Sequence, residues 1–389
     1  MASPAALDGI MVLDFSTVGP AARCARILAD YGATVVKIGA PKRAGAVQTE
    51  APFHAYAGGR GMKQVRIDLK SEAGRAAVLR LAAGADVVIE SFRPGVAARL
   101  GIGHEELRAV NERIVYCSTS GYGQEGARAS WAGHDLDYLA VGGFLHMSGR
   151  RNDGGPALPG ATIADAAAGG MQAAIAIFAA LLRRSATGEG AYIDVSVADG
   201  VLSLLALTID QHLATGTQPA PGGDLLSGRY ACYDVYPAGD GKWLAVAAIE
   251  PAFWANLCRA LGLERWVSSQ LDDAAQEKIR ADLRAAFAAR SRDEWIELLA
   301  PRDTCVAPVL SIGEVAADPH FAQRGAFGWA EHPQYGRFRQ VAAVLAGAAR
   351  AHHTVSLRGA SETDTAELLR SAGLSAEEIA KLESEGIIA

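Results

Sequence analysis

Asp165 is the side chain in this sequence best placed for chemistry. It opens the apolar stretch ADAAAGGMQAAIAIFAALL, a predicted helix, and small residues follow it. Small residues leave room for a ligand, and the free N–H groups of a first helical turn stabilise an anion. An ordinary N-cap, worth about 1 kcal/mol, is the structural alternative. We favour a functional carboxylate because the pair Gly169 and Gly170 follows, which a cap does not need.

His134 and Glu250 are weaker candidates when each is considered alone. His134 directly precedes the periodic run DLDYLA, so it stands at a helix start, where Asp135 complements the helix dipole. A single histidine there more often has a structural role. Glu250 ends the apolar strand-like run AVAAIE just before Pro251, and it gains interest if it faces a histidine.

Glycines beside cations form a second group of candidates, for binding phosphate. Backbone N–H groups and a positive side chain can reach the same phosphate, although a solvated turn is the commoner role of such segments. The segments are AGGRGMK with Arg60 and Lys63, SFRPG with Arg93 and nearby Arg99, and YGQEG with Tyr122 and Gly123.

The first half of the chain predicts a doubly covered parallel sheet that would position these groups. β-branched runs alternate with helical patterns, and the runs are apolar throughout, as in strands buried on both faces. The predicted strands are 9–15, 33–38, 86–91, 113–120 and 192–197, and the predicted helices are 21–31, 72–83, 135–147 and 165–182. The first turn lacks GxGxxG and the second strand ends without an acidic residue, which argues against NAD binding.

From about residue 215 the pattern changes to that of a smaller α+β domain. A Gly- and Pro-rich stretch, 214–228, leads to two alternating strands separated by the turn PAGDG, which predicts an antiparallel hairpin. Helices are expected at 251–261, 275–289 and 292–299. The tail predicts two amphipathic helices, with Ser375 and Glu378 as a capping box.

Composition narrows the class of protein. The net charge of −6 gives no general attraction to nucleic acid, and the five cysteines are scattered, as thiols are in a reducing compartment. The N-terminus has no signal-peptide pattern. Segment 163–182 contains Asp165 and a glycine pair, so a core helix is favoured over a membrane span. We expect a cytoplasmic enzyme that binds neither nucleic acid nor membrane.

Eight ordered segments resemble the family of class III CoA-transferases and α-methylacyl-CoA racemases. They are LADYGATVVKI, VRIDLKS, ADVVIESFRPGVAARLGIG, NERIVYCSTSGYGQEG, AGHDLDYLA, IADAAAGGM, GKWLAVAAIEP and DTCVAPVL. The resemblance implies an α/β fold and an interlocked homodimer. It implies a large Rossmann-like CoA-binding domain from 1–200 and 325–389, a linker helix and loop at 201–224, and a small domain with a connecting segment at 225–324. It implies no cofactor beyond the CoA moiety of the substrate.

The resemblance also assigns roles to the three candidates. Asp165 falls where both branches place an essential aspartate, which in transferases attacks the thioester and forms an aspartyl-CoA intermediate. His134 in AGHD-x-x-Y and Glu250 in AIEP match a pair typical of racemases. The predicted activity is therefore 1,1-proton transfer at the α-carbon of a 2-methylacyl-CoA. A CoA-transferase, or a non-catalytic acyl-CoA-binding subunit, is the alternative.

Two positions depart from the racemase pattern. Racemases have an arginine near the end of the second strand, where this chain has Ala40, so Lys37, Lys42 or Lys63 would have to serve. Arg229 stands in the acyl-side loop, where a small residue is expected; it would narrow the pocket or attract a substrate carboxylate. The resemblance leaves the acyl group and the preferred enantiomer open.

Overall fold

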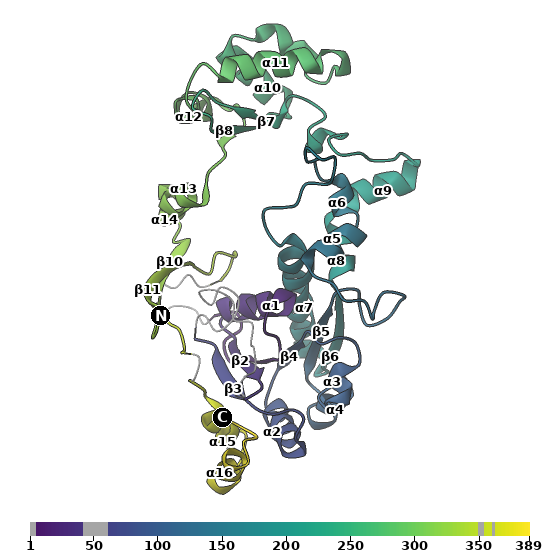
Figure 1. Ribbon diagram of the computed structural model, residues 1–389, viewed down its shortest axis with the longest axis vertical. Helices are drawn as coiled ribbons and strands as arrows, with labels where there is room; N and C mark the ends of the chain where they lie inside the picture. Colours follow the sequence, from purple (N-terminus) through teal and green to yellow (C-terminus); the bar gives the residue numbers. More distant parts are fainter. Residues whose placement is uncertain (1–4, 42–60, 349–353, 360–361) are drawn as a thin grey trace. The chain divides into compact units, whose positions relative to one another are not determined.

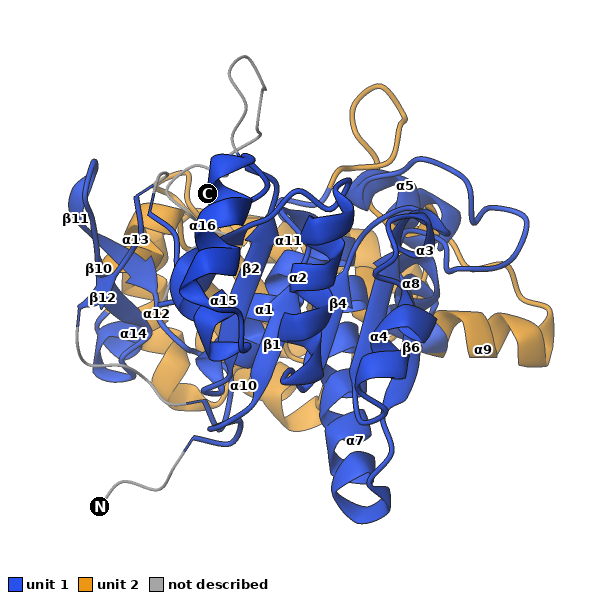
Figure 2. Cartoon of the chain, turned by 90° about the horizontal axis from the view of Figure 1, so that it is seen from below, with its two compact units in different colours: residues 1–144, 159–206, 319–389 blue, residues 145–158, 207–318 orange. Residues whose placement is uncertain are grey.

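The computed structural model describes residues 5–41, 61–348, 354–359 and 362–389. The chain forms two compact units, coloured separately in Figure 2. Unit 1 comprises residues 1–144, 159–206 and 319–389, and unit 2 comprises residues 145–158 and 207–318. From the sequence, the large domain was expected to end at 200 and to resume at 325. In the structure, unit 1 ends at 206 and resumes at 319.

Unit 1 is built on a six-stranded parallel sheet, as predicted, in the order β3-β2-β1-β4-β5-β6 (Figure 1). The strand order reverses between β1 and β4, and in such sheets ligands bind outside the carboxyl ends of the strands at this point. The strands are β1 (Met11–Asp14), β2 (Thr34–Gly39), β3 (Lys63–Arg66), β4 (Val87–Glu90), β5 (Val115–Ser120) and β6 (Ala191–Ser196).

Helices cover both faces of this sheet because successive strand residues point to opposite sides. In β1, Val12 packs with the helices of one face and Leu13 with those of the other. The first face carries α1 (Gly19–Asp30) and α7 (Gln172–Thr187). The second carries α2 (Glu72–Ala83), α4 (His104–Val110), α15 (Thr365–Ser371) and α16 (Ala376–Ser384), which lie in front of the strands in Figure 2. The short α3 (Val96–Arg99) precedes α4.

The C-terminal segment closes the edge of the sheet. An edge strand exposes backbone groups that can pair with another chain. Here the N–H of Gln64 donates to the Asp364 carboxylate at 2.8 Å, and that of Arg66 to the Thr365 hydroxyl at 3.0 Å. Both ends of the chain therefore build unit 1. The capping box of Ser375 and Glu378 is confirmed at the start of α16.

The long helix predicted for 135–147 is wrong, because two glycines interrupt it. It consists of α5 (Asp135–Val141) and α6 (Phe144–Met147). Gly143 has φ +88°, a left-handed conformation that ends a helix. A Cβ on Gly142 would lie 2.4 Å from Cγ1 of Val201, in α8 (Val197–Leu204), so this turn packs closely on α8.

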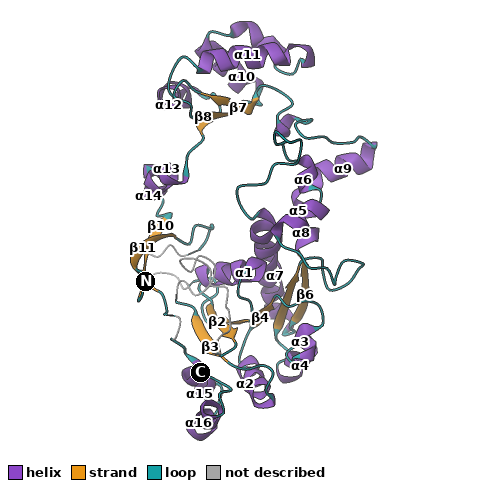
Figure 3. Cartoon of the chain, viewed as in Figure 1, coloured by secondary structure: helices purple, strands orange, loops and turns teal. Residues whose placement is uncertain are grey.

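Unit 1 also contains a small sheet that the sequence pattern did not reveal. Strand β10 (Phe327–His332) pairs antiparallel with β11 (Gly336–Val341) and parallel with β12 (Val355–Ser356). The helix α14 (Pro319–Gln323) precedes it. The arrangement of strands and helices within unit 1 can be followed in Figure 3.

Unit 2 contains the predicted hairpin and its covering helices. Strands β7 (Tyr233–Pro237) and β8 (Trp243–Ala247) pair antiparallel, and β9 (Val306–Pro308) adds to β8. The buried rings of Tyr236, Trp254 and Phe287 fill the core. The helices are α9 (Ala206–Thr215), α10 (Pro251–Leu261), α11 (Gln276–Phe287), α12 (Arg292–Leu299) and α13 (Ile312–Ala317); 3₁₀ turns cover Leu225–Ser227, Glu264–Ser269, Asp273–Ala275 and Ala300–Arg302.

Candidate active site

Two helix starts meet at Asp165. The residue lies in the first turn of a π-helix, Ala164–Met171, which continues as α7. Its backbone N–H donates to Oδ1 of Asp135, the first residue of α5, at 2.8 Å. Single π-turns occur frequently at functional sites, and each helix start carries partial positive charge. The arrangement therefore joins two electropositive helix ends around the Asp165 carboxylate.

The glycine pair behind Asp165 serves helix packing, which corrects our interpretation of it as room for a ligand. A Cβ on Gly169 would lie 2.4 Å from the Pro20 Cβ, and one on Gly170 would lie 2.8 Å from the Arg23 Cβ. Both neighbours belong to α1. The π-helix and α1 can approach this closely because the glycines have no side chain, and the contact fixes where Asp165 stands.

Burial and the neighbouring charges together shift the pKa of the Asp165 carboxyl. Burial raises its pKa above the ordinary value, the charge of Asp135 raises it further, and Arg23 and His134 partly lower it. Arg23 is held by the Thr162 hydroxyl. A raised pKa makes Asp165 a better proton donor near neutral pH than an ordinary carboxyl group.

His134 stands at the start of α5, as predicted. Its backbone N–H donates to the Asp137 carboxylate at 2.9 Å, and its side chain is exposed, so the imidazole can be reached from outside unit 1. Tyr138 supports the preceding turn by donating from its hydroxyl to the Gly133 carbonyl at 2.5 Å. Burial and the charge of Asp165 raise the pKa of Tyr138 to about 12, so this phenol stays protonated.

Glu250 belongs to unit 2, where it precedes α10 as the N-cap residue and is exposed. The strand end before it is held by Gln270, whose Nε2 donates to the carbonyls of Ala248 at 3.0 Å and Ile249 at 2.6 Å. The predicted pairing of Glu250 with His134 joins two different units and stays a prediction.

Arg229, the unexpected cation of unit 2, has a partner within its own unit. Its guanidinium donates to both carboxylate oxygens of Asp273, from Nε at 3.0 Å and from a terminal nitrogen at 2.8 Å. It also lies over the Tyr230 ring. A substrate carboxylate would have to compete with Asp273 for this guanidinium.

The lysines predicted to bind CoA phosphates differ in their surroundings. Lys37 donates to the fully buried Asp14 at 2.6 Å, and removing it would leave a buried charge unpaired. Lys63 begins β3, beside Val36 of β2, and pairs with Glu367 at 2.8 Å. Lys42 and Arg60 lie outside the described residues.

Other predicted phosphate ligands lie beyond the carboxyl ends of β4 and β5. Arg93 and Arg99 are exposed on either side of Gly95, which adopts φ +77°. Tyr122 and Gly123 follow β5, and Gly123 has φ +83°. This edge of the sheet therefore carries both the cations and the glycine turns that suit a phosphate.

Arg66 is a basic residue of this edge that the sequence analysis missed. It ends β3 beside Gly39, the last residue of β2. A Cβ on Gly39 would lie 2.7 Å from a terminal guanidinium nitrogen of Arg66, so the guanidinium lies across the end of β2. The sequence shows this residue only as an arginine within the run QVRI. Its position beside Gly39 can be recognised only once β2 and β3 are known to pair.

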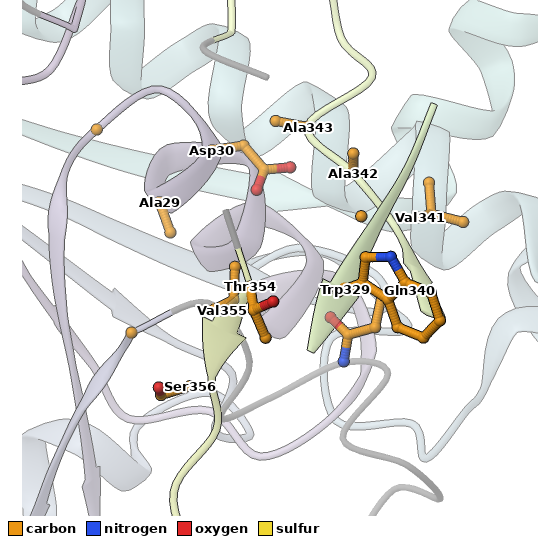
Figure 4. Close-up of a pocket in the computed structure, with 13 residues that line it drawn as sticks. Ala29, Asp30, Trp329, Gln340, Val341, Ala342, Ala343, Thr354, Val355 and Ser356 are labelled. Atoms are coloured by element: carbon orange, nitrogen blue, oxygen red, sulfur yellow. The ribbon is translucent and has the colours of Figure 1, made fainter. Parts of the chain in front are cut away.

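A cavity of about 440 Å³ lies between the end of α1 and the small sheet. Trp329 and Gln340 line it from adjacent strands (Figure 4). Among the described residues, its lining includes no basic side chain and none of the three candidate catalytic residues. Within the described residues, no group of His, Cys, Asp and Glu is arranged to hold a metal ion.

Comparison with known proteins agrees with this fold and shows the family. Residues 7–357 match CoA-transferase family III, and the chain therefore belongs to that family. Human alpha-methylacyl-CoA racemase is 36% identical over 83% of this chain and 82% of its own length. Acetyl-CoA:oxalate CoA-transferase of Acetobacter aceti is 32% identical, with 82% and 84% covered. The crystal structure of Rv3272 from M. tuberculosis has a TM-score of 0.76 at 27% identity, with 92% and 97% covered. The family thus includes both racemases and CoA-transferases.

Proposed function

We propose that this protein is an acyl-CoA racemase or epimerase that inverts the α-carbon of a 2-methylacyl-CoA. The observation that carries the proposal is the junction of α5 and the π-helix. There the exposed His134 lies close enough to Asp165 to influence its carboxyl pKa, and the Asp135–Asp165 hydrogen bond fixes the geometry. Inverting a carbon centre by proton transfer requires a base on each face.

In the proposed mechanism, His134 removes the α-proton from one face and Asp165 returns a proton to the other; the roles reverse for the opposite enantiomer. Glu250 orients the imidazole. The raised pKa of Asp165 makes its carboxyl a better proton donor than an ordinary carboxyl group, which suits a residue that must both return and remove a proton. N–H groups at the two helix starts stabilise the negative charge on the enolate oxygen. The amide of Asp165 is committed to Asp135 and is not one of them.

The CoA moiety is proposed to lie at the carboxyl edge of the sheet, against Arg93, Arg99 and Arg66. Ala40, after β2, supplies no positive charge for the phosphates. Arg66, at the end of the neighbouring strand β3, would supply it instead. Its position across Gly39 supports this role.

A CoA-transferase is the second candidate, and the Acetobacter aceti relative favours it. In that case Asp165 attacks the thioester carbonyl and His134 is structural. The two chemistries differ in what they require: a transferase needs a free acid as acceptor, and a racemase does not.

The deciding experiment follows deuterium uptake at the α-carbon. The protein is incubated with (R)-2-methylacyl-CoA in D₂O without an acceptor acid, and NMR records deuterium content and epimer ratio. We expect uptake with approach to equal epimers. His134→Ala should lower the rate by about 10²–10⁴-fold, the usual worth of a general base.

Glu250→Gln should also slow exchange, and Glu189→Gln, an exposed carboxylate beyond α7, is the matched control that should not. Absence of uptake, together with CoA transfer once a free carboxylic acid is added, would overturn the racemase proposal in favour of the second candidate.

A further inference from the structure

A second cavity, of about 410 Å³, lies in unit 1 between α3–α4 and the strands β4, β5 and β6. It is distinct from the cavity of Figure 4, with which it shares no lining residue. The side chains that give it chemical character are Glu90, Arg93, His104, Tyr116, Gln124 and Tyr192.

Aromatic rings form one wall of this cavity. Tyr116 and Tyr192 stack with ring centroids 6.0 Å apart and an interplanar angle of 26°. The His104 ring lies 5.1 Å from the Tyr192 ring and 5.8 Å from the Tyr116 ring. The faces of tyrosine rings carry negative potential, so a cation is attracted to such a wall.

A buried acid lies within the same cavity. Glu90 ends β4 and is only 4% exposed. It accepts hydrogen bonds from the Ser118 hydroxyl and, at 2.7 Å, from the Phe92 backbone N–H. Both donors are neutral. Among the residues that the structure describes, Glu90 has no ion-pair partner, although an ionised carboxylate accepts about four hydrogen bonds.

Such a carboxylate is costly to keep ionised without a cation. Burial raises the pKa of Glu90, with a smaller contribution from the charge of Asp194, which expresses that cost. A bound cation would compensate for the lost hydration. Glu105 and Glu106 add two more carboxylates to the lining. With Glu90 these make three carboxylates against the single guanidinium of Arg93, so the lining as a whole favours a cation over the CoA phosphates.

We propose that this cavity binds a small organic cation with planar N–H donors, of the guanidinium class. A guanidinium matches the remaining acceptor positions of a carboxylate and stacks on aromatic faces, which a compact ammonium does less well. The site uses none of the three candidate catalytic residues, and Arg93 is the residue that it shares with the proposed CoA site.

Binding is tested with the intact protein and methylguanidinium chloride, followed by calorimetry and by NMR shifts of the tyrosine ring protons. We expect saturable binding in the millimolar range, corresponding to about −4 kcal/mol. Glu90→Gln should weaken it about tenfold, because the charge partner is lost. Tyr192→Leu, at a partly exposed ring, should weaken it through loss of the stacking surface. Glu189→Gln, an exposed carboxylate outside the lining of this cavity, is the control and should bind as before.

Tetramethylammonium, which has no N–H donor, should bind more weakly than methylguanidinium. The proposal is overturned if no saturable binding occurs, or if Glu90→Gln and Tyr192→Leu both bind as the parent does. It is also overturned if ADP displaces methylguanidinium, since the cavity would then be part of the CoA site. Circular dichroism checks that each variant is folded, and Tyr192→Leu decides the outcome should Glu90→Gln unfold.

Discussion

Asp135 shifts the pKa of the Asp165 carboxyl, although the sequence indicated for Asp135 only a favourable interaction with the helix dipole. Asp135 accepts the Asp165 N–H, and its charge raises the pKa of the Asp165 carboxyl. An asparagine at 135 keeps an oxygen for the hydrogen bond and removes the charge. It therefore separates positioning from electrostatics.

We expect Asp135→Asn to lower the pKa of Asp165, because a repelling negative charge is gone. The acidic limb of the rate against pH, which reports deprotonation of this carboxyl as a base, should shift to lower pH. The measurement is α-proton exchange across the pH range. An unmoved limb, or one shifted upward, would contradict this account, and Glu189→Gln serves as control.

Arg66 gives a second prediction at the residue scale. Arg66→Ala should raise KM for an acyl-CoA with a smaller effect on kcat, by about 1–2 kcal/mol of binding, as expected for a charge-assisted contact with phosphate. An acyl-pantetheine thioester, which lacks the nucleotide phosphates, should be turned over by parent and variant alike.

Lys63→Ala is the matched control for that prediction, since Lys63 lies at the other end of β3 from Arg66 and pairs with Glu367. Should Lys63→Ala raise KM and Arg66→Ala leave it unchanged, the proposed place of the phosphates would be wrong.

Among the elements, the contact between α1 and the π-helix sets the position of the site. Gly169 packs against Pro20 with no room for a side chain. Gly169→Ala should lower the free energy of unfolding by about 1–2 kcal/mol, because overpacking exceeds the gain in helix propensity. It should also slow α-proton exchange, because the π-turn that carries Asp165 has to shift.

Gly160→Ala provides the comparison, since a Cβ at Gly160 would meet no atom within 4 Å. Urea denaturation measures stability for both variants. Equal stabilities would mean that α1 can move away at little cost, and the glycine would not define the site.

Hydrophobic periodicity predicted most elements of this fold, and its failures have physical reasons. The bounds of α2, α10 and α12 agree with prediction to the residue, because apolar spacing and flanking signals coincide there. Strand β3, with the sequence KQVR, is an edge strand whose polar residues leave no continuous apolar run. The π-turn carries the same apolar pattern as an α-helix and cannot be distinguished by period.

The candidate site was predictable in its residue types and less so in its partners. His134 and Asp165 were found through helix starts and the family resemblance. Contacts such as Asp135 with Asp165, Lys37 with Asp14, or Arg66 with Gly39 join positions 23 to 30 residues apart. They depend on which elements pack together, which local sequence does not encode.

At the scale of the whole molecule, the helix formed by the π-helix and α7 has one apolar face that the described residues of the chain leave exposed. Met171, Ile175 and Leu182 are 42%, 68% and 75% exposed and share a face by their spacing. The opposite face packs in the core through Ala173, Ala174 and Ile177. By length and composition alone, segment 164–187 would also suit a membrane span, but this core packing and Asp165 favour a protein partner.

We propose that a second copy of the chain covers this exposed face, in line with the homodimer that the family resemblance implies. Light scattering after size exclusion should give about twice the 40.5 kDa chain mass. Ile175→Glu with Leu182→Glu should shift the protein toward the monomer, and Arg183→Glu, also exposed on α7, should not. A monomeric parent would remove this proposal.

The way the C-terminal segment closes the sheet has a consequence during synthesis on the ribosome. Strand β3 leaves the ribosome early, yet the groups that satisfy its edge, Asp364 and Thr365, are made 300 and 299 residues after their partners. All of unit 2 is translated in between. Throughout that interval the nascent chain carries an open strand edge, the feature through which sheets from different chains associate. The edge of β3 is therefore satisfied, and association through it prevented, only after residues 364 and 365 have been translated.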